Sequence, residues 1–482
     1  MHKFTSFLSS RRFFWIIVAF FVSESLWIAL SFRYPMLYDE QFHFGIIKIF
    51  SHQLLPFITN QPKTYDGYGD LAHQGLLYHY VMSWPYRLIE AFTASQSAQV
   101  IFLRVLNIAM AGSGFVIYSR LFRRVGMKQV YINVALLFFA LLPITPFLAA
   151  TINYDNLLFP LAALYLLACV RLVLGDHITW RNVTALIILG CLASLVQFSF
   201  LPIFTASILY LLVILTKRHG KKLLEEIYNS TKKTNKLFLG LSTLGVLLSV
   251  SLFSNLYIQN IVRYKTPSPS CTATMGRQRC LSDGLERRNI VAFATRQTRP
   301  VLTLSDYTKE WIASMEDTTL MTGANTPSGA VANPGLPIMY NLMYFLPIAS
   351  IGVLAYAWRS LRKNDSWYFL LVTSVALTAV VYLVNVQSYY NLHAAYANQV
   401  RYILPVLPIF IIMVAYAASD VLRNYRKVRA ACLIFMLLLF TQGGGLVGHI
   451  LPSQDSWYWD NSTVIKANHA AKKLLSPLVK GG

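Results

Sequence analysis

Residues 13–45 read FFWIIVAFFVSESLWIALSFRYPMLYDEQFHFG. The first part is an apolar run of about 20 residues, which is long enough to cross a hydrocarbon core of about 30 Å as a helix. The run ends at Phe32, and the acidic pair Asp39 and Glu40 follows within a few residues. The stretch therefore predicts a transmembrane helix that brings two carboxylates to a membrane surface.

The acidic pair has two readings. Carboxylates held beside low-dielectric walls are suited to abstracting a proton from a hydroxyl, or to binding a metal. Asp39 and Glu40 would then be catalytic, and His43, three residues further on, would help to bind substrate. The alternative is that both acids are interfacial charges that keep a helix end hydrated. The rest of the chain favours the first reading.

The composition indicates an all-α polytopic membrane protein. Of the 482 residues, 55% are hydrophobic and only 13% are charged, and the mean hydropathy is +0.48. Apolar runs of membrane-spanning length recur along the chain, and only helices satisfy their own backbone within a bilayer when no closed barrel is formed. We predict about eleven transmembrane helices, in the runs 13–32, 99–119, 129–149, 156–174, 183–201, 202–216, 237–257, 336–358, 366–385, 402–420 and 429–447.

Basic residues orient these helices. With the N-terminus in the cytoplasm, the cytoplasmic segments are short and hold 23 of the 42 Lys and Arg residues, as the positive-inside rule requires. The net charge of +22 therefore needs no nucleic-acid partner. Anionic membrane lipids are its natural surroundings. An odd number of spans leaves the C-terminus outside.

The loops expected on the outer side are the long ones. They are residues 33–98 (the first long loop), residues 258–335 (the second long loop) and the C-terminal tail 448–482, all within one membrane domain, 1–482. Cys271 and Cys280 share the second long loop at a spacing that can close a disulfide in an oxidising compartment, although two unpaired thiols remain the alternative.

The first long loop contains two candidate interfacial helices. Apolar residues of 42–57 fall on one side of a helix, and 73–92 is rich in the aromatics that favour the headgroup level. His73, at the start of the second segment, is a candidate substrate-binding residue. Asp70 lies in a turn-forming segment, and its carboxylate is expected to stabilise that turn.

Two further outward segments carry polar groups. Asp155 lies in a very short turn, where a carboxylate would face the same cavity as Asp39; helix capping is the alternative, and it is the expected role of Asn153. Arg401 lies at the outer edge of a membrane helix, where its forked guanidinium suits a phosphate. Its alternative is contact with lipid headgroups. The candidate substrate-binding residues near Arg401 are Tyr389, Tyr390 and His393.

The motifs and their order resemble a known family. YDEQFHFG (38–45), HQGLLYHY (73–80) and RYILPVLP (401–408) are similar to segments of the GT-C superfamily of polyprenyl-phosphate-sugar-dependent glycosyltransferases, which includes the protein O-mannosyltransferases and bacterial relatives. One residue is inserted between Glu40 and His43 relative to that pattern. The resemblance spans most of residues 1–175 together with 400–410.

The resemblance implies a function. The chain would move a hexose or pentose from a polyprenyl-phosphate carrier to a hydroxyl of a glycan, lipid or protein acceptor, with inversion, in a bacterial plasma membrane. Asp39 would be the general base, and the site would face outward. Some relatives place a divalent metal between such carboxylates, but the spacing here defines no ligand set.

Two other classes remain open. A transporter or flippase of lipid-linked glycans would also be polytopic and basic, but it should carry charges deep in several helices, and here these are essentially Glu24 and Arg104. A non-catalytic subunit of envelope glycan assembly would keep the fold and tolerate loss of Asp39. Turnover of the sugar donor separates the three classes.

Overall fold

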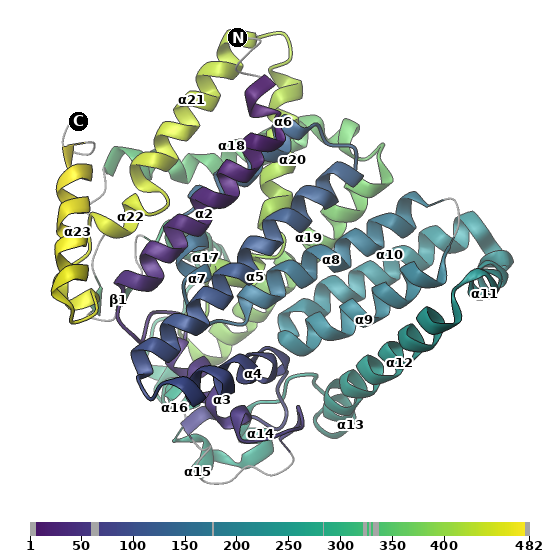
Figure 1. Ribbon diagram of the computed structural model, residues 1–482, viewed down its shortest axis with the longest axis horizontal. Coiled ribbons are helices and arrows are strands. Elements are labelled where there is room, and N and C mark those ends of the chain that lie inside the picture. The colour runs from purple at the N-terminus through teal and green to yellow at the C-terminus, as the bar shows by residue number, and fades with distance from the viewer. Residues whose placement is uncertain are drawn as a thin grey trace.

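The computed structural model describes residues 6–58, 67–175, 178–282, 284–321, 325–326, 329–330 and 337–477. Helices dominate this described part, and the strands in it are two residues each, the antiparallel pair β1 (Asn325–Thr326) and β2 (Gly329–Ala330). The prediction of an all-helical polytopic architecture is confirmed (Figure 1).

Every apolar run predicted to cross the membrane overlaps a helix. The corresponding helices are α2 (Arg11–Ser31), α5 (Gln96–Arg124), α6 (Gln129–Leu141), α8 (Asp155–Leu174), α9 (Trp180–Val196), α10 (Leu201–His219), α12 (Lys236–Phe253), α18 (Pro337–Leu361), α19 (Asp365–Leu392), α20 (Leu407–Val421) and α21 (Arg426–Gly443).

Six helical stretches of the described chain are long and apolar enough to cross a membrane. They contain α2, α5, α8, α10, α12 and α19, and α10 continues through η3 (Gly220–Lys222) into the amphipathic α11 (Leu223–Lys233). The predicted single run 129–149 is broken: α6 ends at Leu141 and the short α7 (Ile144–Ala149) follows. Pro143 and Pro146 explain the break, because proline has no backbone N–H to continue a helix.

The centre of the bundle is the contact of α5 with α8, and α2 packs on α5. A glycine permits the close approach of α5 and α8. A Cβ added at Gly114 would lie 2.2 Å from a ring carbon of Phe159. Small residues at such contacts let helix backbones come together where no water drives association.

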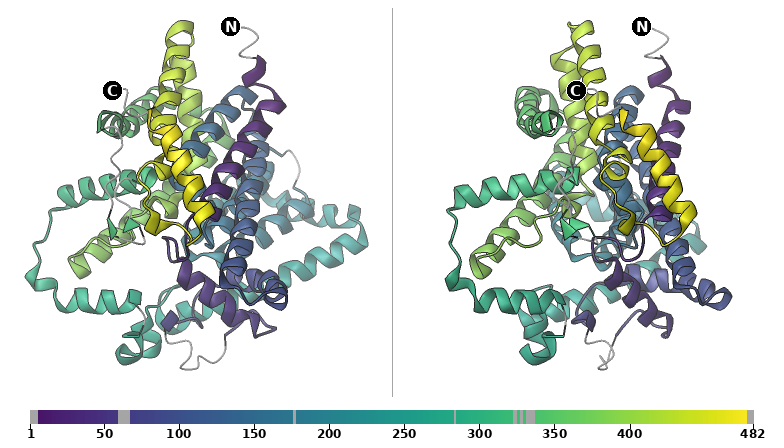
Figure 2. Two further views of the ribbon diagram at one scale, coloured as in Figure 1. Left: turned by 60° about the vertical axis from the view of Figure 1, so that its left-hand side comes forward. Right: turned by 90° about the vertical axis from the view of Figure 1, so that its left-hand side faces the viewer.

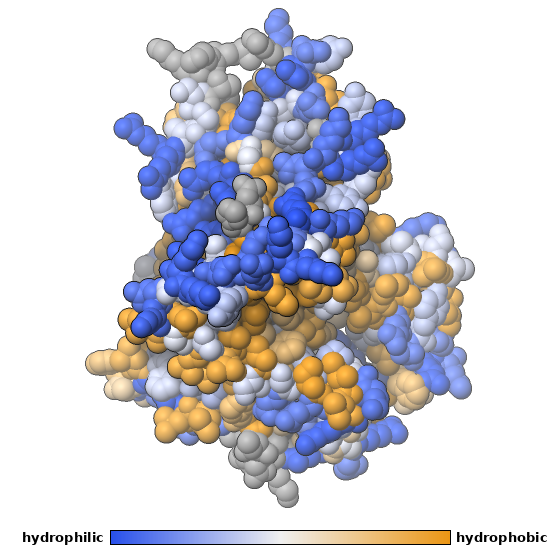
Figure 3. Space-filling view, turned by 90° about the vertical axis from the view of Figure 1, so that its right-hand side faces the viewer, coloured by the Kyte–Doolittle hydropathy of each residue, from blue (hydrophilic) through white to orange (hydrophobic). Residues whose placement is uncertain are grey.

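The outward surface of the helices suits lipid. On α12 the exposed side chains include Leu237, Leu241, Leu244 and Leu248. Figure 3 shows hydrophobic residues gathered in a band across one face of the molecule, with hydrophilic residues on both sides of it. A band of this kind is expected where a bilayer surrounds the protein.

The two helices predicted in the first long loop are present with shorter bounds. They are α3 (Glu40–Ser51) and α4 (Leu77–Phe92), which pack against each other. The expected continuation of α3 to Phe57 was wrong; the chain turns at His52, ahead of Pro56. Residues 73–76 were expected to be helical, but this stretch is tied to Asp70 instead, since Asp70 Oδ1 accepts the His73 N–H at 3.2 Å.

The second long loop forms short helices at the same end of the molecule as α3, away from the N-terminus (Figure 2). Cys271 and Cys280 are joined by the predicted disulfide. The elements that follow α12 are η4 (Ser254–Ile258), α13 (Gln259–Tyr264), α14 (Cys271–Met275), α15 (Arg277–Cys280), α16 (Gly284–Ala294), η5 (Arg296–Thr298) and α17 (Leu304–Leu320).

The C-terminal tail returns to α2. Arg33 N donates to Trp457 O at 2.8 Å, and Trp459 N donates to Ser31 O at 3.1 Å. Asn468 accepts from Trp27 Nε1 at 3.0 Å, so the last helix lies beside α2. The remaining short elements are η2 (Phe198–Phe200), η6 (Val400–Ile403), α22 (Val447–Ile450), η7 (Asp455–Trp457) and α23 (Ser462–Leu475).

Candidate functional site

Asp39 stands directly before α3 in an uncommon backbone conformation. Tyr38 and Asp39 both have φ of 64°, in the left-handed region that side chains other than glycine rarely adopt. Asn153 Nδ2 donates to the Tyr38 carbonyl at 3.0 Å and so fastens this turn to the start of α8. The Asp39 side chain is 49% exposed, so it is accessible from outside the protein.

Arg401 meets Asp39 across the bundle. Its Nη2 lies 2.9 Å from Asp39 Oδ2, although the two residues are 362 positions apart in the chain. The guanidinium is buried, and it lies over the rings of Tyr38 and Tyr402, at 5.3 and 5.2 Å from their centroids. Arg401 Nε has no hydrogen-bond partner among the described residues. A buried cationic donor is therefore left free beside Asp39.

Asp155 lies in the same place. It is 3% exposed, and its Oδ2 accepts no hydrogen bond from the described part of the chain. Its backbone N–H donates to Asn153 Oδ1 at 2.9 Å, so Asn153 stabilises the helix start as predicted and also holds Tyr38. The Asp155 carboxylate itself makes no capping bond that the structure shows. Burying a polar atom without a partner costs free energy unless a ligand completes the site.

Glu40 is directed away from Asp39 into the protein. Its carboxylate is fully buried and forms a forked ion pair with Arg104 of α5, at 2.8 and 2.7 Å. It also accepts the N–H groups of Met36 and Ile152 at 2.7 and 3.2 Å. Arg104 uses its remaining Nη1 on the carbonyls of Ala29 and Phe32. This pair joins α2, α3, α5 and the turn before α8.

His43 lies one helical turn after Asp39 and is buried. Its Nδ1 is 2.9 Å from Nε2 of His79 on α4, and its ring centroid is 4.8 Å from that of Tyr154. Burial, with a smaller effect of the Arg401 charge, lowers the pKa of His43 from 6.5 to about 3. Burial also lowers the pKa of His79. Both rings are therefore neutral near pH 7, and one donates to the other.

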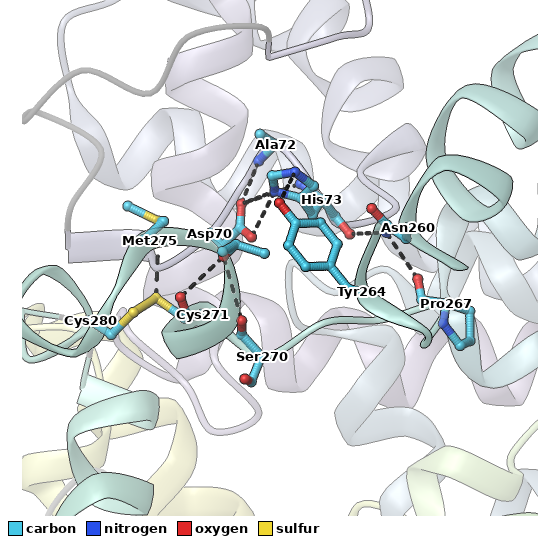
Figure 4. A network of polar contacts seen from close by, with 11 residues as sticks. Asp70, Ala72, His73, Asn260, Tyr264, Pro267, Ser270, Cys271, Met275 and Cys280 are labelled. Atoms are coloured by element: carbon cyan, nitrogen blue, oxygen red, sulfur yellow. Dashed lines mark hydrogen bonds and ion pairs between the residues drawn. A yellow bond between two sulfur atoms is a disulfide. The ribbon is translucent and has the colours of Figure 1, made fainter. Parts of the chain in front are cut away.

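His73 is not brought to this group by any contact of the described residues. Its Nδ1 is 2.9 Å from Asp70 Oδ2, and its Nε2 faces the hydroxyl of Tyr264 at 3.4 Å. Asn260 Nδ2 donates to the His73 carbonyl at 3.0 Å. Figure 4 shows Asp70, His73 and Tyr264 close together, with the Cys271–Cys280 disulfide nearby. The network connects the first long loop to the second.

The residues predicted near Arg401 bind protein groups. Tyr389 OH accepts the Leu302 N–H at 2.8 Å, and Tyr390 OH donates to the Leu302 carbonyl at 3.4 Å. His393 Nδ1 is 2.8 Å from the Arg296 carbonyl. These three side chains therefore hold the second long loop against the end of α19, next to the segment that leads to Arg401.

The sequence did not identify Tyr38, Arg104, Tyr154 or His79 as parts of the site. Arg104 had a signal, since it is a charge within an apolar run, but its partner could not be read from hydropathy. Tyr38 and Tyr154 are tyrosines, which are abundant at membrane interfaces, and His79 lies in the aromatic-rich segment 73–92. In the part of the chain that the structure describes, no three His, Cys, Asp or Glu side chains lie close enough to hold a metal ion.

An apolar cavity of about 1070 Å³ lies among α6, α17, α18, α20 and α21, and its lining reaches the residue next to one that contacts Tyr38. Its wall includes Glu316, Thr319 and Leu320 of α17, and the next residue, Met321, accepts the hydroxyl of Tyr38 at 3.1 Å. Other lining side chains come from α6, α18, α20 and α21, among them Val130, Phe138, Ile351, Phe410 and Leu437.

No family model and no curated protein matches the sequence. Solved structures of ArnT from Cupriavidus metallidurans, in the apo state and bound to undecaprenyl phosphate, are similar in fold at 13% and 12% identity and TM-scores of 0.47 and 0.46. They cover 96% and 97% of this chain, which spans 73% and 72% of theirs. ArnT is a glycosyltransferase of the GT-C superfamily, whose motifs the segments quoted above resemble. A likeness at this level assigns no substrate and no residue role here.

Proposed function

We propose that this protein transfers a sugar from a polyprenyl-phosphate carrier to an acceptor hydroxyl on the outer face of a membrane, with inversion. The observation that carries the proposal is the pair of unsatisfied buried groups, Arg401 Nε and Asp155 Oδ2, beside the accessible carboxylate of Asp39. Such a transfer requires a cationic hydrogen-bond donor for the phosphate, a hydrogen-bond acceptor for a sugar hydroxyl, and an exposed base.

Each group has a chemical role. Asp39 takes the proton of the acceptor hydroxyl, whose oxygen then attacks the anomeric carbon from the side opposite the leaving phosphate. Arg401 donates to the phosphate oxygens and stabilises the charge that grows on them as the bond to the sugar breaks. Asp155 accepts a hydrogen bond from a hydroxyl of the sugar or of the acceptor substrate. His43 adds polarity without charge, because its lowered pKa keeps it neutral.

Glu40 takes a different role from the one expected from the sequence. Its carboxylate is enclosed by Arg104 and two backbone N–H groups, so it offers no accessible oxygen to a substrate. We assign it to positioning: the residue directly before it is Asp39, and the ion pair fixes the turn from which Asp39 projects.

The apolar cavity supports a lipid-linked donor. Along α6 its lining runs from Val130 to Leu142, and a helix rises 1.5 Å per residue, so the cavity extends for roughly 18 Å. An isoprenoid chain is an apolar ligand that fits such a space, while its phosphate would reach Arg401 past Leu320 and Met321. A soluble nucleotide sugar is polar and has no apolar chain that would fill such a cavity.

The test measures release of polyprenyl phosphate from a panel of polyprenyl-phosphate sugars by the purified protein. Wild type should release it, and Asp39→Asn should lower turnover by about 10²-fold or more, because the amide keeps the shape but accepts no proton. Donor binding should survive in Asp39→Asn and weaken in Arg401→Ala, since the phosphate is held by the guanidinium.

Asp306→Asn is the matched control, because Asp306 is an exposed carboxylate of α17 that pairs with Lys309. It should turn over at the wild-type rate. A correctly inserted Asp39→Asn protein with nearly normal turnover would remove Asp39 as the base. Absence of turnover with every donor, together with movement of an intact lipid-linked glycan across a bilayer, would favour a flippase instead.

A further inference from the structure

The second long loop carries a concentration of positive charge that membrane topology does not explain. Between Arg263 and Arg299 there are eight Lys and Arg residues and two acidic residues; we call this stretch the cationic segment. The positive-inside rule accounts for basic residues in short cytoplasmic loops and depletes them on the other side. The cationic segment lies at the end of the molecule that holds Asp39, which the proposed topology places outside.

Much of this charge is available to a ligand. The side chains of Arg263, Lys265, Arg277 and Arg287 are exposed. Arg277 and Arg287 have no ion-pair partner among the described residues. Figure 1 shows α14 and α15 beyond α3 and α4, on the side away from the long helices. α15, which begins at Arg277, therefore lies beyond the two helices of the first long loop.

The cationic segment borders the stretch that leads to Arg401. The guanidinium carbon of Arg288 lies 4.1 Å from the ring centroid of Tyr396, and the Arg296 carbonyl is 2.8 Å from His393 Nδ1. Residues 393–400 connect these contacts to Arg401, the second residue of η6 (Val400–Ile403). A ligand held on the segment would thus lie at the rim of the candidate site.

The segment is also fixed in place rather than loosely attached. Tyr264, between Arg263 and Lys265, faces His73 of the first long loop, and Asn260 donates to the carbonyls of His73 and Pro267 at 3.0 Å each. The Cys271–Cys280 disulfide closes the part that carries Arg277 (Figure 4). A fixed set of positive charges concentrates anions more effectively than a mobile one, because no ordering is needed on binding.

We propose that the cationic segment collects the acceptor, and that the acceptor is a polyanion: a glycan or glycolipid that bears several phosphates or carboxylates. This inference rests on the proposed function, because it names the acceptor class of the same site. Arginine forks match phosphate and carboxylate geometry. A surface of one charge beside low-dielectric walls raises the local concentration and the association rate of an oppositely charged substrate by about 10- to 10³-fold.

The first experiment measures binding alone. The full-length protein in nanodiscs of neutral lipid is titrated with fluorescently labelled polyphosphate and with labelled neutral dextran, at several salt concentrations. Wild type should bind the polyphosphate with an affinity that falls as salt rises, and should not bind dextran. The double variant Arg277→Glu/Arg287→Glu should weaken polyphosphate binding by about tenfold or more at low salt.

The matched control is Lys466→Glu/Lys473→Glu, which reverses two exposed lysines of α23. It should bind polyphosphate like wild type. Equal weakening by both double variants, or no weakening by either, would overturn the proposal. Competition by a simple anionic phospholipid in the nanodiscs, seen with wild type and absent with Arg277→Glu/Arg287→Glu, would also overturn it, because the segment would then bind membrane headgroups and not a glycan or glycolipid.

The second experiment separates this proposal from the proposed function. With an acceptor offered in phosphorylated and dephosphorylated forms, Arg277→Glu/Arg287→Glu should raise KM for the phosphorylated form about tenfold and leave kcat unchanged. If the wild-type KM is equal for both forms, the polyanion proposal is overturned, and the observed turnover still supports the transferase proposal. If polyphosphate binds as expected but no donor is turned over, the transferase proposal is overturned. The cationic segment is then an anion-binding surface without the proposed transfer.

Discussion

At the scale of single residues, the orientation of Asp39 depends on its neighbours. Left-handed backbone at two successive residues, Tyr38 and Asp39, costs of order 1–3 kcal/mol per residue and persists only when the surroundings hold it. The Tyr38 carbonyl is held by Asn153 and also accepts from Arg401 Nη1 at 3.4 Å. Strain of this kind at an accessible carboxylate is typical of a functional site.

The Glu40–Arg104 pair gives a prediction that separates positioning from catalysis. Glu40→Gln should lower the free energy of unfolding by about 3–5 kcal/mol, because it leaves the charge of Arg104 buried without a counter-ion. Asp39→Asn should change stability far less, because Asp39 is half exposed and the Asp155 carboxylate remains near Arg401. Thermal unfolding of the detergent-solubilised variants measures both.

Arg104→Met is the partner variant for a double-mutant cycle. Combined with Glu40→Gln it should recover a large part of the lost stability, since no unpaired charge then remains. Turnover of the stable double variant should stay low if the pair positions Asp39. Normal stability of Glu40→Gln with abolished turnover would instead return Glu40 to a direct catalytic role.

At the scale of elements, the disulfide should stabilise the second long loop locally. Closing so short a span contributes roughly 2–3 kcal/mol in the chain-entropy model. Cys271→Ser/Cys280→Ser should therefore increase amide exchange in α13 to α15, measured by hydrogen–deuterium exchange, and leave α5 and α8 protected. Cys432→Ser, at an exposed free cysteine, is the control and should change nothing. Unchanged exchange in the double variant would show that the network around His73 suffices.

The helices themselves were predictable, because the membrane allows few solutions. Each apolar run had to form helix over most of its length, and each overlaps a helix of the structure. The errors were at breaks: Pro143 and Pro146 split one run, and α3 stops at Ser51. Hydropathy reports how apolar a segment is, not where its backbone turns, so these boundaries need local proline and turn chemistry that the averaged pattern conceals.

The candidate site was predictable only in part. Sidedness grouped Asp39, Asp155 and Arg401, and these lie together. Glu40 and Arg104 could not be paired from the sequence, because 64 positions and two helices separate them. For His73, the aromatic pattern suggested a ligand-binding role, but its nitrogens are directed to Asp70 and Tyr264. Such pairings depend on helix rotation, which one sequence does not reveal.

At the scale of the whole molecule, the two ends differ in the segments that they carry. The end with the N-terminus carries short basic loops, and the opposite end carries α3, α4 and the second long loop around Asp39 (Figure 2). Under the proposed function, a lipid-linked donor would reach the site laterally through the apolar cavity, while a polar acceptor would approach from water. The arrangement separates the two substrates by their solubility.

This separation requires a defined orientation, which is the last prediction. The excess of Lys and Arg in the short loops at the N-terminal end predicts that this end is cytoplasmic. In a cysteine-free background, Ala94→Cys, between α4 and α5, should react with an impermeant thiol reagent on intact cells. Asn424→Cys, between α20 and α21, should react only after the membrane is opened. Both positions are exposed, so reactivity reports the side and not burial. The reverse pattern would place Asp39 and Arg401 in the cytoplasm, where nucleotide sugars are available, and would remove the reason for a lipid-carried donor.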